Sequence, residues 1–168
     1  MSFFINLKEV KSKILKKENF YFLLISIFIF ALDRFTKLKI IQDINENPYY
    51  VNDYINLDLT WNIGIGFGLL STDSSVIYYF ISLLISVIIL ILFIFFIISK
   101  NFDKFIYSII IGGALGNLYD RLFFNAVPDF IDLHYRGFHW FTFNMADIFI
   151  TIGVLMLIFK EIFFKNEK

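Results

Sequence analysis

The chain has 168 residues, of which 58% are hydrophobic and 21% aromatic, and its mean hydropathy is +0.72. These values exceed those of ordinary soluble domains and indicate an integral membrane protein. Fifteen Lys and Arg residues balance 15 Asp and Glu residues, which excludes the basic surface of a nucleic-acid-binding protein. The absence of cysteine excludes a disulfide framework, thiolate metal sites and thiol catalysis. The length suits one membrane-embedded domain over residues 1–168.

Four apolar segments predict four transmembrane helices. The clearest is 76–98, which has 23 consecutive residues without a charge, and about 20 such residues cross the hydrocarbon core of a bilayer. Further spans are expected at about 20–40, 105–124 and 144–160, each with polar residues toward one end. The predicted fold class is therefore an all-α integral membrane protein with four transmembrane helices.

The distribution of lysine predicts the orientation of these spans. Five lysines precede residue 20, Lys100 and Lys104 lie between the second and third spans, and three more lysines lie from residue 160 onward. By contrast, residues 42–75 contain no Lys or Arg, and residues 123–147 contain only Arg136. The positive-inside rule therefore places both termini in the cytoplasm.

The basic N-terminus and the apolar stretch after it also fit a cleaved signal peptide. No small-x-small cleavage site follows that stretch, because the chain continues as Asp33-Arg-Phe-Thr-Lys37. An uncleaved first span is therefore the preferred interpretation.

Two longer loops, 42–75 and 125–143, are expected on the outer side of the membrane. Residues 54–62 alternate between polar and apolar side chains, which predicts one or two short strands and hence a small β-rich cradle at the outer face. The second segment is interpreted as a loop. In that loop we expect Asp132 to be solvated and His134 to be an interfacial polar residue.

Polar side chains from different segments converge at one depth. A rise of about 1.5 Å per residue from the cytoplasmic ends places them in the outer third of the membrane. They are Asp33, Lys37, Asn62, Asn117, Asp120, Arg121, Asp129, Asn144 and Asp147. Polar groups at this depth are costly to bury, so they mark a functional site. Within this set, Asp33 and Lys37 form an i,i+4 pair, while Gly112 and Gly116 form a small-xxx-small pair for close helix packing.

The residue types narrow the chemistry that such a site could perform. Both histidines lie outside the spans, which disfavours a serine–histidine protease, and no His-x-x-x-His ligand set for zinc is present. A Gly-rich phosphate loop is also absent. Two aspartates from different segments remain, and a carboxyl pair that shares one proton can activate water for peptide hydrolysis.

Five ordered motifs between residues 33 and 147 resemble the lipoprotein signal peptidase family, also called signal peptidase II or prolipoprotein signal peptidase. They are Asp33-Arg-Phe-Thr-Lys37, Asn62-Ile-Gly64-Ile-Gly-Phe67, Gly112-Gly-Ala-Leu-Gly-Asn117-Leu-Tyr-Asp120-Arg121, Val127-Pro-Asp129-Phe130 and Phe143-Asn144-Met-Ala146-Asp147. The resemblance implies four helices, cytoplasmic termini and an active site near the outer face of the bacterial inner membrane.

The resemblance also implies roles for single residues. Asp129 and Asp147 match the catalytic dyad of the family, and Asn117 and Asn144 match residues that support the geometry of the dyad. The remaining matches are the substrate-binding positions Asn62, Gly64 and Arg121 and the structural pair Asp33 and Lys37.

The implied substrate is a bacterial prolipoprotein whose lipobox cysteine carries diacylglyceryl, and cleavage falls just before that cysteine. The implied partners are this substrate, membrane lipid and globomycin-type inhibitors, with no nucleic acid, no metal and no cofactor, and a monomer is expected. Pro128 and Gly66 depart from the usual family pattern. Pro128 restricts Val127 to an extended conformation, which suits a loop that carries Asp129.

These aspartates also admit other interpretations. Tyr119-Asp120 also occurs in presenilin-type proteases, but their Gly-x-Gly-Asp motif is absent, so Asp120 is expected to compensate the charge of Arg121. Asp147 could simply favour the dipole of its helix. A small transporter would hold its carboxylates near the bilayer midplane, and a non-catalytic adaptor would tolerate replacement of both aspartates.

Overall fold

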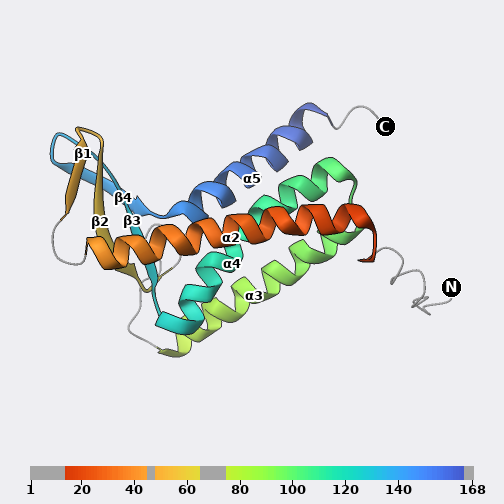
Figure 1. The fold of residues 1–168 in the computed structure, drawn as a ribbon, viewed down its shortest axis with the longest axis horizontal. Coiled ribbons are helices and arrows are strands. Elements are labelled where there is room, and N and C mark those ends of the chain that lie inside the picture. The colour runs from red at the N-terminus through yellow and green to blue at the C-terminus, as the bar shows by residue number, and fades with distance from the viewer. Residues whose placement is uncertain (1–13, 45–47, 65–74, 165–168) are drawn as a thin grey trace.

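The computed structural model describes residues 14–44, 48–64 and 75–164, and within them it contains four helices and a four-stranded sheet (Figure 1). Gly66, segment 65–74 of the first outer loop and the lysines at positions 8, 11, 13, 165 and 168 lie outside these ranges. The elements, in chain order, are α2 (Lys17–Asp43), β1 (Tyr49–Asn52), β2 (Ile55–Asn62), α3 (Ser75–Ile98), α4 (Asn101–Phe124), β3 (Val127–Tyr135), β4 (Phe138–Phe143) and α5 (Met145–Phe163).

Helix α4 is the centre of the bundle and packs against α2, α3 and α5. Glycines permit this close packing. A Cβ atom at Gly112 would lie 2.8 Å from the carbonyl oxygen of Ser26 in α2, and one at Gly113 would lie 2.7 Å from that of Ala146 in α5. A Cβ at Gly116 would overlap the Asp33 carboxylate. The predicted close approach at Gly112 and Gly116 is therefore confirmed, and Gly113 adds a second contact on the other side of α4.

Within the described residues, Val76–Ile98 is the one helix that is long and apolar enough, by composition alone, to cross a membrane. Helices α2 and α4 carry buried charged groups, including Asp33 and Lys37 in α2 and Lys104 and Asp120 in α4. These charges lower the mean hydropathy of the helices that form the polar interior.

The sheet is antiparallel with the order β1-β2-β3-β4, so β3 is paired on both edges. The alternating segment 54–62 does form strand structure, mainly as β2. However, the second outer segment is not a loop, because residues 127–143 form the β3–β4 hairpin. The sheet is thus larger than predicted and is built from both of the segments 42–75 and 125–143.

Two local features explain why the hairpin was not predicted. Its turn is Arg136-Gly137, with φ of 49° and 80°, the positive values that a two-residue type I′ turn requires. Arginine at such a position is uncommon. Pro128 also argues against an inner strand, because it lacks an amide hydrogen. Pro128 pairs with Trp61 of β2, close to a register shift, and lies before the part of β3 that pairs with β4. Asp129 pairs with Thr60 and is therefore on a strand instead of a loop.

The sheet lies at one end of the helix bundle (Figure 1). The C-terminal ends of α2 and α4 and the N-terminal end of α5 approach that end, whereas the start of α2 and the end of α5 lie at the opposite end. This arrangement brings polar residues from helices and strands to one place.

Candidate active site

Asp129 is held between two asparagine side chains. Its exposed fraction is 2%. Its Oδ2 accepts a hydrogen bond of 2.8 Å from Asn62 Nδ2, and its Oδ1 accepts one of 2.6 Å from Asn144 Nδ2. Burial, followed by the nearby charge of Asp147, raises the pKa of Asp129 to about 6. This carboxyl can therefore exchange a proton near neutral pH.

Asp147 lies in the first turn of α5 and belongs to a capping box with Asn144. The backbone N–H of Asp147 donates to Asn144 Oδ1 at 3.1 Å, and Asp147 Oδ2 accepts from the backbone N–H of Asn144 at 3.2 Å. Asp147 thus caps its helix in addition to lying in the site. The other oxygen, Oδ1, accepts a hydrogen bond of 2.8 Å from Asn117 Nδ2. Asn144 therefore bonds to both carboxyl groups, through its side chain to Asp129 and through its backbone to Asp147.

Lys37 is fully buried and orients Asn117. Its Nζ donates to Asp33 Oδ2 at 2.8 Å, to Asn117 Oδ1 at 2.8 Å and to Asp120 Oδ2 at 2.7 Å. These bonds use all three hydrogens of the ammonium group. Because Lys37 takes the oxygen of the Asn117 amide, the NH₂ group must face Asp147. The predicted Asp33–Lys37 pair is present and is part of this larger network.

Asp33 connects α2 with the start of α5. Its Oδ1 accepts a hydrogen bond of 3.0 Å from the backbone N–H of Ala146, one residue before Asp147. Such a donor at a helix N-terminus has no partner within its own helix. Asp33 thus fixes the position of the turn that carries Asp147.

Asp120 contributes only a minor part of the charge compensation of Arg121 that is expected of it. It pairs with Lys37 and with Arg34 of α2, whose guanidinium lies 4.6 Å from the centroid of the Tyr119 ring. Consecutive residues of a helix point about 100° apart, so Asp120 and Arg121 face different neighbours. Arg34 was not predicted in the site, although it lies inside the first matching motif.

Arg121 instead joins the end of β2. Its Nη2 donates to the Gly64 carbonyl at 2.9 Å and its Nη1 to the Asn117 carbonyl at 3.2 Å. Asn62 Oδ1 accepts from the Gly64 N–H at 2.8 Å. Asn62, Gly64 and Arg121 therefore lie together next to Asp129. Arg121 Nε is buried and has no hydrogen-bond partner among the residues that the structure describes.

The nine residues to which the resemblance assigns roles all belong to one hydrogen-bonded cluster: Asp33, Lys37, Asn62, Gly64, Asn117, Arg121, Asp129, Asn144 and Asp147. Two neighbouring expectations are wrong. Asp132 is 4% exposed instead of solvated, and His134 is 8% exposed instead of interfacial. Both side chains lie in β3. The strand pairing on both sides of β3 buries them, and this pairing was not predicted.

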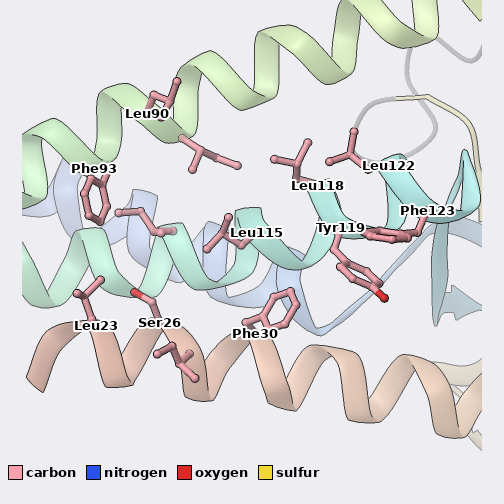
Figure 2. Close-up of a pocket in the computed structure, with 13 residues that line it drawn as sticks. Leu23, Ser26, Phe30, Leu90, Phe93, Leu115, Leu118, Tyr119, Leu122 and Phe123 are labelled. Carbon is pink, nitrogen blue, oxygen red and sulfur yellow. The ribbon is translucent and has the colours of Figure 1, made fainter. Parts of the chain in front are cut away.

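A separate groove of about 530 Å³ lies among α2, α3 and α4 (Figure 2). Its walls are almost entirely apolar, and none of the nine clustered residues lines it. Side chains that point into it include Leu23, Phe30, Leu90, Phe93, Leu115 and Leu122. The groove and the hydrogen-bonded cluster are therefore different features of the molecule.

Comparison with solved structures gives the class of protein. The chain superposes on a bacterial membrane enzyme solved by the in meso method at 2.3 Å resolution, with a TM-score of 0.71, 30% identity and coverage of 88% of this chain and 93% of the other. A second bacterial membrane enzyme, solved by the same method at 1.9 Å, gives a TM-score of 0.69 at 31% identity, with coverage of 83% and 90%. The chain therefore shares its fold with these two bacterial membrane enzymes.

Sequence comparison gives the family. The profile of the family described as Signal peptidase (SPase) II matches residues 25–163, and the chain belongs to this peptidase family. It is 49% identical over 155 residues to the lipoprotein signal peptidase of Pelagibacter ubique (strain HTCC1062), covering 90% of this chain and 93% of the relative. It is 36% identical over 157 residues to that of Francisella tularensis subsp. novicida (strain U112), covering 88% and 94%.

Proposed function

We propose that this chain is an aspartyl endopeptidase that removes the signal peptide of diacylglyceryl-modified bacterial prolipoproteins just before the lipidated cysteine. The observation that carries the proposal is the double hydrogen bonding of Asn144, which links the carboxyls of Asp129 and Asp147. Family membership and the names of the relatives support the substrate class.

The dyad would act through one shared proton. The ionised carboxyl takes a proton from a water molecule, whose oxygen attacks the scissile carbonyl, while the protonated carboxyl donates to the carbonyl oxygen. Collapse of the tetrahedral intermediate breaks the C–N bond, and the leaving amine receives a proton from the dyad. The raised pKa of Asp129, to about 6, supports this role because it favours single protonation of the pair near neutral pH.

Asn117, Asn144 and Lys37 would act as positioning residues. Asn144 Nδ2 donates to Asp129 and Asn117 Nδ2 donates to Asp147, while Lys37 orients the Asn117 amide through its oxygen. Asn62, Gly64 and Arg121 would contact the substrate backbone, and the buried Arg121 Nε, free of partners within the described residues, is a donor for a peptide carbonyl. We expect globomycin-type inhibitors to compete at the same residues.

We further propose that all four helices cross the bacterial inner membrane, with both termini in the cytoplasm and the dyad near the outer leaflet. Exposed apolar side chains on each helix support this arrangement, for example Phe28, Phe80, Phe123 and Leu155. The lysine distribution supports the orientation. The chain would act as a monomeric single domain over residues 1–168, and the two acyl chains of the substrate would hold it in the membrane plane.

The test uses purified wild type, Asp129→Asn, Asp147→Asn and the control Asp58→Asn, which removes an exposed carboxyl from the same sheet. Each protein is incubated in detergent with a diacylglyceryl-modified prolipoprotein, and products are read by gel shift and mass spectrometry. We expect the dyad variants to cleave about 10²–10⁴-fold more slowly than wild type and Asp58→Asn. Cleavage that persists in both dyad variants would contradict the aspartyl mechanism. A folded wild type that never cleaves would contradict the proposed activity.

A further inference from the structure

The β3–β4 hairpin places three potential metal ligands on one face of the sheet. Asp132 and His134 are two residues apart on β3, so their side chains point to the same side. His139 on β4 lies directly opposite His134 in the strand register. Their rings are stacked, with centroids 5.3 Å apart and an interplanar angle of 25°. The hairpin itself therefore assembles a set of two imidazoles and one carboxylate.

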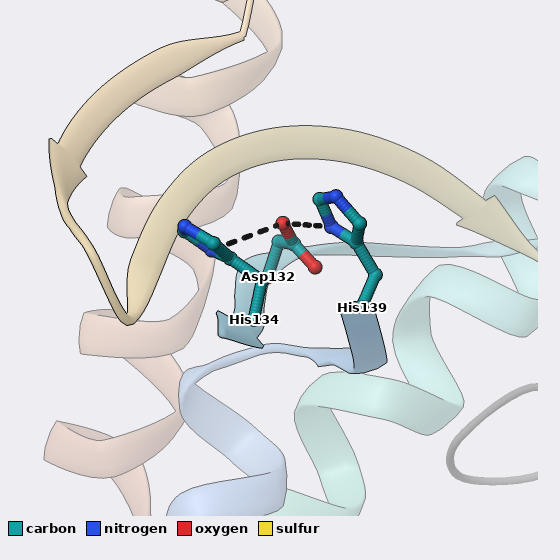
Figure 3. Close-up of side chains that lie close together, drawn as sticks. All are labelled: Asp132, His134 and His139. Carbon is teal, nitrogen blue, oxygen red and sulfur yellow. Dashed lines mark hydrogen bonds and ion pairs between the residues drawn. The ribbon is translucent and has the colours of Figure 1, made fainter. Parts of the chain in front are cut away.

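The ligand atoms converge on one carboxylate oxygen, as Figure 3 shows. Asp132 Oδ2 lies 2.7 Å from His139 Nδ1 and 3.6 Å from His134 Nδ1. One ligand atom from each of the three residues lies within 4.8 Å of the others. Tetrahedral zinc with bonds of about 2.1 Å separates its ligand atoms by about 3.4 Å. Small rotations of the side chains would therefore bring the set to the geometry of a zinc site.

Hydrogen bonding within the described residues leaves two buried polar atoms of these strands, His134 Nδ1 and Asn56 Oδ1, unsatisfied. His134 Nδ1 is buried and has no hydrogen-bond partner, since 3.6 Å exceeds hydrogen-bond length, and the His134 residue is only 8% exposed. Asn56 Oδ1 is likewise buried and unpartnered. Asn56 on β2 is the direct register partner of Asp132, so its side chain shares the same face. A bound cation would satisfy both atoms, and a His139–Asp132 hydrogen bond alone satisfies neither.

We propose that Asp132, His134 and His139 bind a divalent transition metal ion, with Zn²⁺ as the representative ion, and that Asn56 supplies a further oxygen beside it. Imidazole and carboxylate are common ligands of zinc. The His139 side chain is 59% exposed, which gives the ion a path from solvent and leaves room for water in an open coordination position.

This site is separate from the peptidase site. Asp129 and Asp132 are three residues apart on β3, so they project from opposite faces of the strand. The expected metal-free chemistry of the dyad is therefore unaffected. A bound ion would join β3 to β4 close to the turn and would restrain the strand that carries Asp129.

The test measures zinc binding by full-length protein purified in detergent without a histidine tag. Isothermal titration and metal analysis after dialysis compare wild type, His139→Ala and Asp53→Asn. Asp53 is an exposed carboxyl on the neighbouring β1–β2 turn and serves as the matched control. We expect about one ion per wild-type chain. His139→Ala should bind at least about tenfold more weakly, because loss of even an outer supporting partner costs that much.

Two further readouts follow zinc binding independently of peptidase activity. Zinc should raise the melting temperature of wild type and Asp53→Asn but not of His139→Ala, since a ligand stabilises only the state that binds it. Co²⁺ in place of zinc should give visible absorption that His139→Ala loses. His139 is mostly exposed, so its replacement leaves the fold intact and the comparison valid. Absence of saturable binding by wild type, or equal binding by His139→Ala, would overturn the proposal.

Discussion

The buried Asp129 carboxyl predicts an unusual dependence of folding stability on pH. An aspartate in the unfolded chain has a pKa of 3.8, whereas burial and the charge of Asp147 raise the pKa of folded Asp129 to about 6. Between these values the folded state holds a proton that the unfolded state has lost. Stability therefore falls as the pH rises through this window. The group contributes least at neutral pH and most below pH 4.

The magnitude follows from the difference between the two pKa values. About two units correspond to about 3 kcal/mol, at about 1.4 kcal/mol for each unit. Asp129→Asn removes this titration, so the variant should gain about 3 kcal/mol relative to wild type between pH 4 and pH 7. The amide also disturbs the hydrogen bonds with Asn62 and Asn144, but that cost does not change with pH. The pH-dependent part of the difference therefore isolates the carboxyl.

The assay is thermal unfolding in detergent from pH 4 to pH 8, with wild type and Asp129→Asn measured side by side. A chain of this size shifts its melting temperature by about 2–4 °C for each kcal/mol. The variant should thus gain about 6–12 °C on wild type across the range. The control Asp58→Asn, on the exposed side of β2, should show no such trend. A constant difference between wild type and Asp129→Asn, or one of opposite sign, would refute the reasoning.

Two other predictions concern the residues that hold the dyad in place. Lys37→Met should destabilise the protein by about 3–5 kcal/mol, because it leaves the Asp33 and Asp120 carboxyls buried without their shared cation; an equal melting shift in the exposed control Lys39→Met would contradict this. Asn144→Ala should cost about 0.5–2 kcal/mol of stability through loss of the helix cap. Its cleavage rate should fall much further than that stability loss explains, and normal kcat in the folded variant would exclude a positioning role.

The helices and the hydrogen-bonded cluster could be predicted from the sequence. Their sequence patterns are local, and the depth of a residue follows from adding the rise per residue along its helix. The uncharged run of α3 is visible in the sequence, and the i,i+4 spacing of Asp33 and Lys37 follows from helix geometry alone. A count of residues from the ends of the spans also brought Asn117 and Asp147 to the same depth. Such arguments require only that the segments are helical and roughly parallel.

The sheet and the partners of Asp120 depend on contacts between distant segments. The sequence around Asp132 resembles that of a loop, and its burial follows only from the pairing of β3 with both β2 and β4. The choice of Asp120 between Arg121 and Arg34 depends on the rotation of α4 relative to α2. No local sequence pattern predicts either the strand order or this rotation. The type I′ turn was also hidden, because Arg136 occupies a position where Asn or Asp is usual.

The double use of Asn144 couples the assembly of the dyad to the folding of α5. The same side chain caps the helix and holds Asp129, and the same backbone N–H holds Asp147. If the first turn of α5 frays, both carboxyls lose a hydrogen bond at the same moment. Under the proposed function, a chain whose last helix has not yet docked would therefore lack the geometry of both proposed catalytic carboxyls at once. In the proposed mechanism, peptidase activity should therefore depend on the docking of the last helix, which would guard against cleavage by an incompletely folded chain.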